Sequence, residues 1–440
     1  MKKRYKHFHR LRVIGNTFAK HGLGFLFDYL GLRDALPIIK RFEPNGKSQR
    51  LAKGERIRLV FEELGTTFIK LGQVLSTRSD FLPDDIIMEL EKLQDGTTTY
   101  DFYEIEEVIT QELGASIGDL FLNFDPVPIA AASIAQVHKA ELGTGQKVVV
   151  KVQRPNLLSE VETDLEILFD LARLADRRTA MGERLQFTNM VEEFTRTLNE
   201  EMDFRVEGRN AERIKHNFRK DDRIHIPFVH WDYTSARVLT TDMLEGVKLG
   251  NIEELSKKGF DKSKLADNLL KIMLEQILLD GFFHGDPHPG NIFALKGGRL
   301  GFIDFGVVGR LDEERKNQLT GIIISLVNKD SDALVHHILE MGITPPDMRK
   351  NLLKKDISEF RDKHYNKLVT EISLRDVFND LFRIVYKYNI TMPSDFILLS
   401  KTMVITEGIV RVLDPQLSVV EVMESFAGTL AKRRFSPENI

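Results

Sequence analysis

Two short polar segments on either side of a predicted hairpin constrain the fold of this chain more than any other feature. The first runs from His284 to Asn291, and the second is Asp304-Phe305-Gly306. Between them, two apolar runs flank the turn Lys296-Gly-Gly-Arg299, a pattern that predicts a small β-hairpin. We therefore expect polar oxygen groups from two separated loops to converge at one place in the molecule.

The residues of these two segments suit phosphoryl transfer from a nucleotide. Magnesium is a hard cation that prefers oxygen ligands and bridges phosphate oxygens. Asp304 follows a predicted strand and Asn291 offers a neutral carbonyl oxygen, so both are candidate magnesium ligands. Asp286 remains to orient or deprotonate an attacking hydroxyl or water. Asp286 and Asn291 are five positions apart, as in the kinase catalytic loop H-R-D-x-x-x-x-N, with Gly285 in place of the arginine.

A lysine after a β-branched run is the second kinase-like feature. The segment Val148-Val-Val-Lys151 corresponds to V-A-I-K, in which the lysine bridges the nucleotide phosphates and is held by a helix glutamate. Candidates for that glutamate lie between Glu200 and Glu207. Taken alone, a Val-Val-Val-Lys run is more often a surface strand end, and Asp-Phe-Gly is more often a turn. Their joint order and spacing predict a kinase-like chain.

Periodicity predicts an α+β protein. Apolar residues at helical spacing alternate with a few β-branched runs, in the order helices, a small sheet with a helical insertion, and a mostly helical half. This order predicts a two-lobed, protein-kinase-like fold with a helical N-terminal extension. The predicted elements are one helix from Arg56 through Leu75, helices over 84–94 and 101–113, strands over 135–142 and 147–151, helical pattern over 157–218, a strand over 237–244, a helix over 262–279 and helices after Glu313.

Composition excludes several other kinds of protein. The chain of 440 residues has 42% hydrophobic and 29% charged residues, which is typical of globular proteins. It has no cysteine, which excludes disulfides, thiolate zinc sites, cysteine nucleophiles and iron–sulfur ligation by this chain. The net charge of −4 gives no signal for nucleic acid. No apolar run is long enough to predict a transmembrane helix, and no secretory signal follows the first charges.

The first 22 residues form a basic arm, with seven lysines and arginines and no acidic residue before Asp28. Its apolar residues predict a face that contacts an anionic membrane surface, and a solvated terminus is an equal alternative. These apolar residues are Leu11, Val13, Ile14, Phe18, Leu23, Phe25 and Leu26. Further along the chain, His284 and His288 suggest a metal pair, but we expect His284 to pack structurally and expect no zinc there.

Several short motifs follow one another in an informative order. They are Lys70-Leu-Gly72-Gln73 with Ser76-Thr-Arg78-Ser-Asp80, Ala130-Ala131-Ala132-Ser133, Lys151, Glu201-Met-Asp203 with Glu207, His284-Gly-Asp286 to Asn291, and Asp304-Phe-Gly306. Together they resemble the UbiB/ADCK group of atypical kinases, a family associated with ubiquinone biosynthesis. The resemblance covers roughly residues 56–414, and the K-x-G-Q element with the alanine loop is specific to this group.

The resemblance implies further roles for individual residues. Lys151 is expected to pair with Glu207. Lys70 is expected to reach Glu201 and Asp203, with Gln73 on the same helix face, in an extension that covers the active site. Without the motif, Lys70 reads as a solvated helix lysine.

The alanine loop and a predicted hinge complete the expected nucleotide site. Ala130, Ala131 and Ala132 replace the glycines of a phosphate loop, Ser133 offers a hydroxyl, and small-residue core packing is the alternative reading of this loop. The backbone of Met243 and Leu244, after the strand over 238–241, is expected to bind adenine. The alanines in place of glycines imply a phosphate geometry different from that of protein kinases.

These expectations define a domain plan and a function. The plan is a basic arm over 1–55, an extension over 56–125, a small lobe over 126–245 and a large lobe over 246–440. The resemblance implies an ATP- and Mg²⁺-dependent kinase or ATPase, cytoplasmic and peripheral at the inner face of the cell membrane. It would act on a small or lipid-derived molecule, alongside quinone-biosynthesis proteins. The alternatives are a protein kinase acting in trans and a non-catalytic nucleotide-sensing scaffold. The family's C-terminal hydrophobic hairpin is not present up to Ile440.

Overall fold

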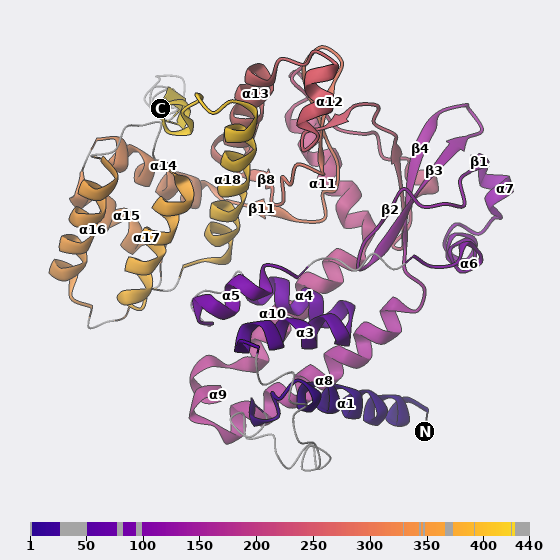
Figure 1. The fold of residues 1–440 in the computed structure, drawn as a ribbon, viewed down its shortest axis with the longest axis horizontal. Coiled ribbons are helices and arrows are strands. Elements are labelled where there is room, and N and C mark those ends of the chain that lie inside the picture. Colours follow the sequence, from indigo (N-terminus) through magenta and orange to yellow (C-terminus); the bar gives the residue numbers. More distant parts are fainter. Residues whose placement is uncertain are drawn as a thin grey trace. The chain divides into compact units, whose positions relative to one another are not determined.

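The structure, a computed structural model, describes residues 2–26, 51–76, 82–93, 99–328, 330–342, 345, 348–365, 373–390, 392–423 and 425–426. The chain divides into two compact units, Met1–Val206 with His230–Asp242 and Glu207–Val229 with Met243–Ile440. Both units combine helices with strands (Figure 1). The chain is therefore an α+β protein, as the residue pattern predicted.

An antiparallel sheet organises the first unit. It contains β1 (Phe121–Phe124), β2 (Ala130–Ala131), β3 (Ala135–Leu142), β4 (Lys147–Gln153) and β6 (Val238–Asp242). The order is β1-β3-β4-β6, with β2 paired to β3. β3 and β4 form a hairpin in which Ala135 lies opposite Gln153 and Glu141 opposite Lys147. The strand, turn and strand predicted for this region are confirmed.

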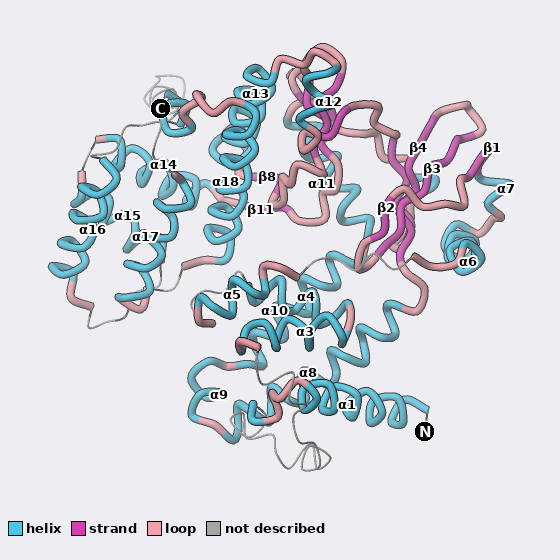
Figure 2. The backbone as a smooth tube through the Cα atoms, viewed as in Figure 1, coloured by secondary structure: helices cyan, strands magenta, loops and turns pink. Residues whose placement is uncertain are grey.

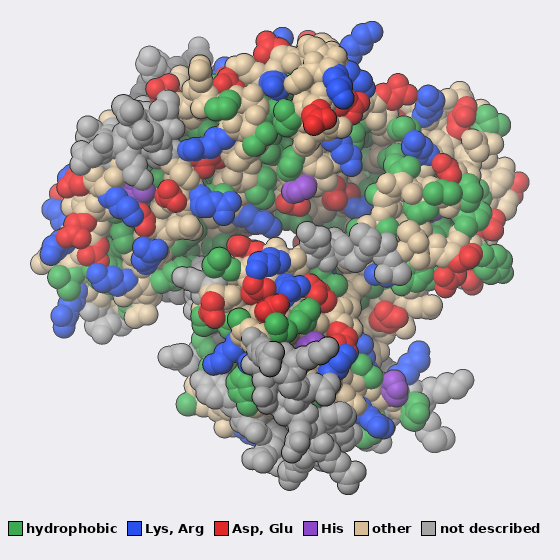
Figure 3. All heavy atoms as spheres, viewed as in Figure 1, with side chains coloured by type: hydrophobic (Ala, Val, Ile, Leu, Met, Phe, Trp, Pro, Cys, Tyr) green, Lys and Arg blue, Asp and Glu red, His purple; other side chains and the backbone are tan. Residues whose placement is uncertain are grey.

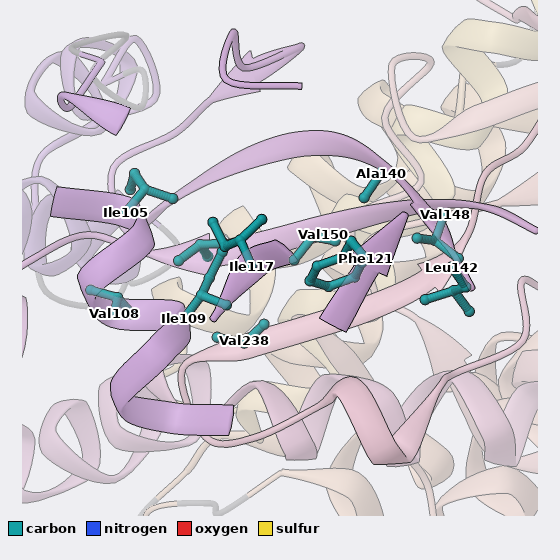
Figure 4. Packing of buried hydrophobic residues seen from close by; sticks show 11 residues of the cluster. Ile105, Val108, Ile109, Ile117, Phe121, Ala140, Leu142, Val148, Val150 and Val238 are labelled. Carbon is teal, nitrogen blue, oxygen red and sulfur yellow. The ribbon is translucent and has the colours of Figure 1, made fainter. Parts of the chain in front are cut away.

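Alternation along β4 gives this sheet one buried face. Val148, Val150 and Val152 are completely buried, whereas Lys147 and Lys151 point to the other side. The three valines pack with Ile105 and Ile109 of α6 (Phe102–Leu113) in one hydrophobic cluster (Figure 4). Lys151 was expected to end the strand, but β4 continues to Gln153. Lys151 therefore lies inside the ladder, with Val137 of β3 and Leu239 of β6 as its neighbours on the two sides.

Helices form the rest of the first unit. They are α1 (Lys2–Lys20), α3 (Lys53–Leu64), α4 (Thr66–Ser76), α5 (Asp84–Leu90), α7 (Ile117–Leu120), α8 (Leu157–Arg178), α9 (Ala180–Leu185) and α10 (Phe187–Met202). The predicted single helix from Arg56 to Leu75 is wrong. It is interrupted at Gly65, whose φ of 90° lies outside the helical region, and a new helix starts at Thr66. The helix predicted over 84–94 is shorter, since α5 ends at Leu90.

Helix α1 packs into the first unit by the face that we predicted for a membrane surface. Ile14 and Leu23 are 1% exposed and belong to a core with residues of α3, α4 and α8. The Arg10 guanidinium donates to both carboxylate oxygens of Asp164 in α8, at 2.6 and 2.8 Å. The expectation of a free apolar face is therefore corrected, because protein side chains cover most of it. Phe25, at 47%, is the one exposed residue among those predicted.

Gly72 of the K-x-G-Q element has a packing role in α4. A Cβ atom at this position would lie 2.2 Å from Leu93 Cδ1 and 2.7 Å from Phe61 Cδ2. We expect Gly72→Ala to lower the free energy of unfolding by about 1–3 kcal/mol through overpacking. Urea unfolding followed by circular dichroism measures this loss. Gly118→Ala in α7 is the matched control, since a methyl group added there would meet no atom within 4 Å, and an equal effect of both changes would contradict the packing argument.

The second unit contains short strands surrounded by helices (Figure 2). β9 (Ile292–Leu295) and β10 (Arg299–Phe302) form the predicted hairpin, with Phe302 opposite Ile292. β7 (Val247–Lys248) pairs with β9, and β5 (Ile224–His225) pairs in parallel with β10. β8 (Phe282–His284) and β11 (Val308–Arg310) form a separate antiparallel pair. These two small sheets position the polar segments that flank the hairpin.

The helices of the second unit follow the predicted helical half. Helix α11 (Phe204–Asn217) begins in the first unit and continues into the second. The remaining helices are α12 (Ile252–Lys257), α13 (Lys262–Leu274), α14 (Glu313–Val327), α15 (Ser331–Met341), α16 (Lys350–Tyr365), α17 (Leu374–Lys387) and α18 (Ser394–Leu413). After α13, a π-helical turn over Glu275–Asp280 ends at Gly281, whose φ is 60°. Gly281 therefore ends this helix, as predicted.

The surface charge and the helix hydropathy agree with the small net charge and the short apolar runs of the sequence. On the face shown in Figure 3, lysines and arginines are interspersed with aspartates and glutamates. Within the ranges given above, no helix is both long enough and apolar enough to cross a bilayer.

Candidate active site

Backbone hydrogen bonds bring the two polar segments of the second unit together. The N–H of Ile303 donates to the carbonyl oxygen of Asn291 at 2.9 Å, at the open end of the β9–β10 hairpin. The side-chain amide of Asn291 donates to the carbonyl oxygen of Asp286 at 3.4 Å. Asp304 follows Ile303 directly. Asp286, Asn291 and Asp304 therefore belong to one local arrangement, as the sequence predicted for the two loops.

The ring of His284 contacts both polar segments. Its side chain is completely buried, and its Nδ1 accepts a hydrogen bond from the N–H of Asp286 at 3.1 Å. Its Nε2 lies 3.2 Å from the carbonyl oxygen of Ile303. A neutral ring with its proton on Nε2 satisfies both contacts, and burial lowers the pKa of His284. Both ring nitrogens are thus engaged, so His284 holds the two segments together, as the structural packing predicted for it requires.

Asp304 has an unusual backbone conformation. Its φ is 61°, in the left-handed region that few residues other than glycine adopt. Such a conformation costs about 1–3 kcal/mol and concentrates at functional sites. The Asp304 side chain is exposed, and its Oδ1 accepts from the N–H of Gly306 at 3.3 Å. The turn therefore presents a carboxylate outward beside Asn291.

Gly285, in the position of the kinase arginine, is required by close packing. A Cβ atom there would lie 2.9 Å from Val307 and 3.1 Å from Leu398 of α18. Thr402 of α18 also donates to the carbonyl oxygen of Gly285 at 3.0 Å. Helix α18 thus occupies the space that a larger residue at position 285 would need.

Three supporting residues were not predicted from the sequence. The Oε1 atom of buried Gln276 accepts from the N–H of His284 at 2.9 Å, and Gln276 lies in the π-helical turn. Buried Asn210 donates to the carbonyl oxygen of Phe305 at 3.0 Å. Thr402 is the third. The position of Asn210 three residues after Glu207, on the same helix face, was the one sequence signal available for any of them.

The buried histidines predict a dependence of stability on pH. Burial lowers the pKa of His284 and, in the first unit, that of His138. In the unfolded chain their pKa is about 6.5. Below that pH the histidines of the unfolded chain take up protons more readily than those of the folded chain. The contribution of the two histidines to the free energy of unfolding is therefore fully present above about pH 6.5. It is lost as the pH falls toward their lower pKa values in the folded chain.

We expect the urea midpoint to fall between pH 7.5 and pH 5.5, because the free energy of unfolding falls by up to about 1.4 kcal/mol per pH unit for each histidine. The variant His138→Gln should lose part of this dependence. His336→Gln should keep it, because His336 is on the surface with a side-chain exposure of 67%. A midpoint that is constant or rises toward pH 5.5 would contradict the account.

Lys151, the predicted phosphate-binding lysine, lies in the first unit. Its Nζ is 5.3 Å from the centroid of the Phe204 ring, a cation–π contact. The neighbouring Gln153 donates to the carbonyl oxygen of Met202 at 2.8 Å, which joins β4 to the end of α10. Glu207 is buried and belongs to the second unit. The pairing of Lys151 with Glu207 stays a prediction.

The ion pair expected for the K-x-G-Q lysine is confirmed in part. Lys70 of α4 forms a salt bridge with Glu201 of α10, and both side chains are largely buried. Asp203 is held by Arg205, with two contacts of 2.9 Å. Gln73 donates to the carbonyl oxygen of Leu93 at 3.4 Å. The segment from Thr77 to Asp80, which belongs to the same motif, lies outside the described residues.

The alanine loop has exposed and buried parts. Ala130 and Ala131 form β2 at the sheet edge, opposite Val137 and Gln136, and Ala130 is exposed. Core packing therefore does not explain Ala130. Ser133 is completely buried, and its hydroxyl has no hydrogen-bond partner among the described residues. The expected hydroxyl contact of Ser133 with a nucleotide is corrected, because the side chain is enclosed by protein.

The predicted adenine-binding segment falls where the two units divide. The division separates Asp242, the last residue of β6, from Met243. Met243 and Leu244 are partly buried. Their contact with adenine stays a prediction.

Two family models match the chain. The model of the ABC1 atypical kinase-like domain matches residues 92–338, and that of the UbiB helical domain matches residues 357–418. The second match covers α17, α18 and part of α16. Together the two matches include the polar segments of the second unit and the helix that packs against Gly285.

Similar proteins come from several bacteria. A probable protein kinase UbiB of Marinobacter nauticus is 33% identical over 89% of this chain and 72% of its own length. A probable protein kinase UbiB of Xanthomonas axonopodis is 32% identical over 98% of this chain and 80% of its own length. An uncharacterized Synechocystis protein, sll1770, is 35% identical over 87% of this chain and 65% of its own length.

One solved structure has a similar fold. The complex of Rv3197 with erythromycin from Mycobacterium tuberculosis matches with a TM-score of 0.54 and 21% identity, over 81% of this chain and 93% of that one. This likeness bears on the fold alone. The two family models and the UbiB relatives show the family, and the solved structure agrees with the fold. The chain belongs to the UbiB/ADCK family of atypical kinases and has its kinase-like fold.

Proposed function

We propose that this chain binds ATP with Mg²⁺ and transfers the terminal phosphoryl group to a small or lipid-derived molecule, or to water, in support of isoprenoid quinone biosynthesis. One observation carries the proposal. The 2.9 Å hydrogen bond from Ile303 to Asn291 holds the two loops with candidate magnesium ligands side by side. The names of the UbiB relatives support the biosynthetic role.

The oxygen donors of the two loops fit magnesium. Bound Mg²⁺ neutralises charge on the phosphates of the nucleotide. In the proposal, Asn291 and Asp304 hold it through an amide and a carboxylate oxygen, the ligand type that this cation prefers. His284 does not compete for the magnesium ion, because its two ring nitrogens contact Asp286 and Ile303.

In the proposal, Asp286 acts on the molecule that accepts the phosphoryl group. Its side chain is partly exposed, and its carboxylate has no hydrogen-bond partner in the part of the chain that the structure describes. Its backbone is held from three sides, by His284, His288 and Asn291. A fixed and available carboxylate is suited to orient an attacking hydroxyl or water and accept its proton.

The first unit contributes the phosphate contacts in this proposal. Lys151 binds the phosphates, with Glu207 orienting its ammonium group, and Ala130 to Ala132 lie along the phosphates in place of a glycine-rich loop. The backbone of Met243 and Leu244 binds adenine. The exposure of Ala130 at the edge of the sheet supports its assignment.

A labelled-ATP assay tests the proposal. The purified chain is incubated with Mg²⁺ and γ-labelled ATP, and label is scored as free phosphate, in vesicles that contain a quinone-precursor mimic, and on added protein. We expect label in the first two fractions and its loss in Asp286→Asn. Label on protein alone would instead indicate a protein kinase acting in trans. Binding of ATP without any turnover would indicate a nucleotide-sensing scaffold.

A further inference from the structure

A cavity of about 820 Å³ lies in the first unit, among residues to which the proposed function gives no role. Helix α1, the start of α4, the end of β4 and the first turns of α8 contribute to its wall. Its volume is in the range of cavities that enclose small organic ligands. Apolar side chains line part of it, among them Leu64, Ile69 and Leu157.

Arg154 lines this cavity and has an unused hydrogen-bonding edge. Its Nη1 donates to the carbonyl oxygen of Ser133 at 2.7 Å and to Thr66 Oγ1 at 3.3 Å. The guanidinium carbon lies 4.7 Å from the centroid of the Tyr100 ring. Its Nε is buried and has no acceptor among the described residues. A buried donor without a partner is costly, and Nε and Nη2 together form the edge that binds a carboxylate or phosphate with two parallel hydrogen bonds.

The remaining charges of the cavity favour an anion. Arg10 and Asp164 neutralise each other at 2.6 Å, and Glu62 pairs outside with Arg58 at 2.6 Å. Three charged residues of the wall remain, Lys6, Arg154 and Glu160. None of the three has an ionic partner within the described ranges, so two positive charges stand against one negative charge. The unpaired groups leave a net positive charge, before any contribution from His9.

We propose that this cavity is a second ligand site, which binds a small organic anion whose carboxylate or phosphate group sits on an apolar body. Arg154 anchors the charged group through Nε and Nη2. Because Nε is enclosed, the guanidinium shifts slightly toward the ligand on binding. The apolar body contacts Leu64, Ile69 and Leu157, and Lys6 attracts the anion from the exposed side of α1.

Isothermal titration calorimetry with matched probes tests this site. Benzoate and phenyl phosphate carry the two kinds of anionic group, benzamide is a neutral molecule of the same shape as benzoate, and inorganic phosphate lacks an apolar body. We expect one or both organic anions to bind at least about tenfold more tightly than benzamide and inorganic phosphate. Binding of benzoate alone or phenyl phosphate alone identifies the preferred head group.

Variants locate the bound probe. Arg154→Lys keeps the charge but loses the two-donor edge, so we expect about a tenfold loss of affinity. Arg12→Gln, on the exposed side of α1 and outside the cavity wall, should change nothing. Lys151→Gln should also leave benzoate binding unchanged. Loss of binding in Lys151→Gln would place the probe in the proposed nucleotide site and overturn the inference.

A second variant covers the case in which Arg154→Lys does not fold. Lys6→Glu changes an exposed side chain without a partner in the described part of the chain, so the fold should persist. It should lower affinity at least about threefold by reversing one charge at the cavity. Equal affinity for benzoate and benzamide, no binding of either anion, or unchanged affinity in these cavity variants would overturn the proposal.

Discussion

Asp304→Asn is expected to lower the affinity for ATP in the presence of Mg²⁺ at least about 100-fold, or about 2.7 kcal/mol. The change removes one anionic ligand from the proposed magnesium site and keeps its size and shape. Asparagine also tolerates a positive φ, so the turn at φ 61° should be retained. The folded structure should therefore persist while the cation loses its charged ligand.

Calorimetric titration with ATP, with Mg²⁺ and with a chelator, measures this effect. Asp222→Asn is the matched control, because it removes the same charge from an exposed carboxylate of the same unit. The control should bind Mg²⁺ and ATP like the unaltered chain. Equal affinities for Asp304→Asn and Asp222→Asn would show that Asp304 does not hold the metal.

His284→Ala is expected to lower the free energy of unfolding by about 3–5 kcal/mol and to abolish turnover of ATP. The fully buried ring contacts Phe302 and Phe305, with centroids 6.0 and 5.3 Å away, so its removal leaves a cavity. The N–H of Asp286 also loses its acceptor, and the carbonyl of Ile303 loses a donor. Both segments of the site should lose their fixed position.

Urea unfolding and the labelled-ATP assay measure the two effects. His288→Ala is the control in the same loop. That side chain is exposed, and among the described residues its Nδ1 accepts only from the nearby Gly290 N–H at 3.1 Å, so we expect a loss below about 1 kcal/mol. A small loss of stability in His284→Ala, or full activity in a folded variant, would show that the histidine does not position the loops.

Local patterns predicted the parts of the fold that local physics determines. The valines of β4 alternate with polar residues, and glycines stand at the turns of both hairpins, so strands and turns could be placed from the sequence. The spacing of Asp286 and Asn291 likewise predicted the loop. Gly65 shows the limit. Its neighbours keep helical periodicity on both sides, and the interruption depends on one backbone angle that periodicity does not reveal.

Burial by distant parts of the chain could not be predicted in the same way. The apolar residues of α1 suit a membrane surface and a protein core equally, and the core of α3, α4 and α8 binds them here. Ser133 looked accessible beside three alanines but is enclosed. The partner of Lys70 followed from family resemblance, since spacing along the chain does not relate Lys70 to Glu201. Gln276 and Thr402 gave no signal because their roles depend on tertiary contacts with His284 and Gly285.

In the proposed function, the loops of Asn291 and Asp304 hold the cation of a magnesium–nucleotide complex. A crystal structure of the chain with Mg²⁺ and a non-hydrolysable ATP analogue tests it most directly. We predict a metal ion about 2.0–2.1 Å from the side-chain oxygens of Asn291 and Asp304, bridging the phosphates. A nucleotide bound elsewhere in the molecule, or a metal ion that neither side chain contacts, would contradict the account.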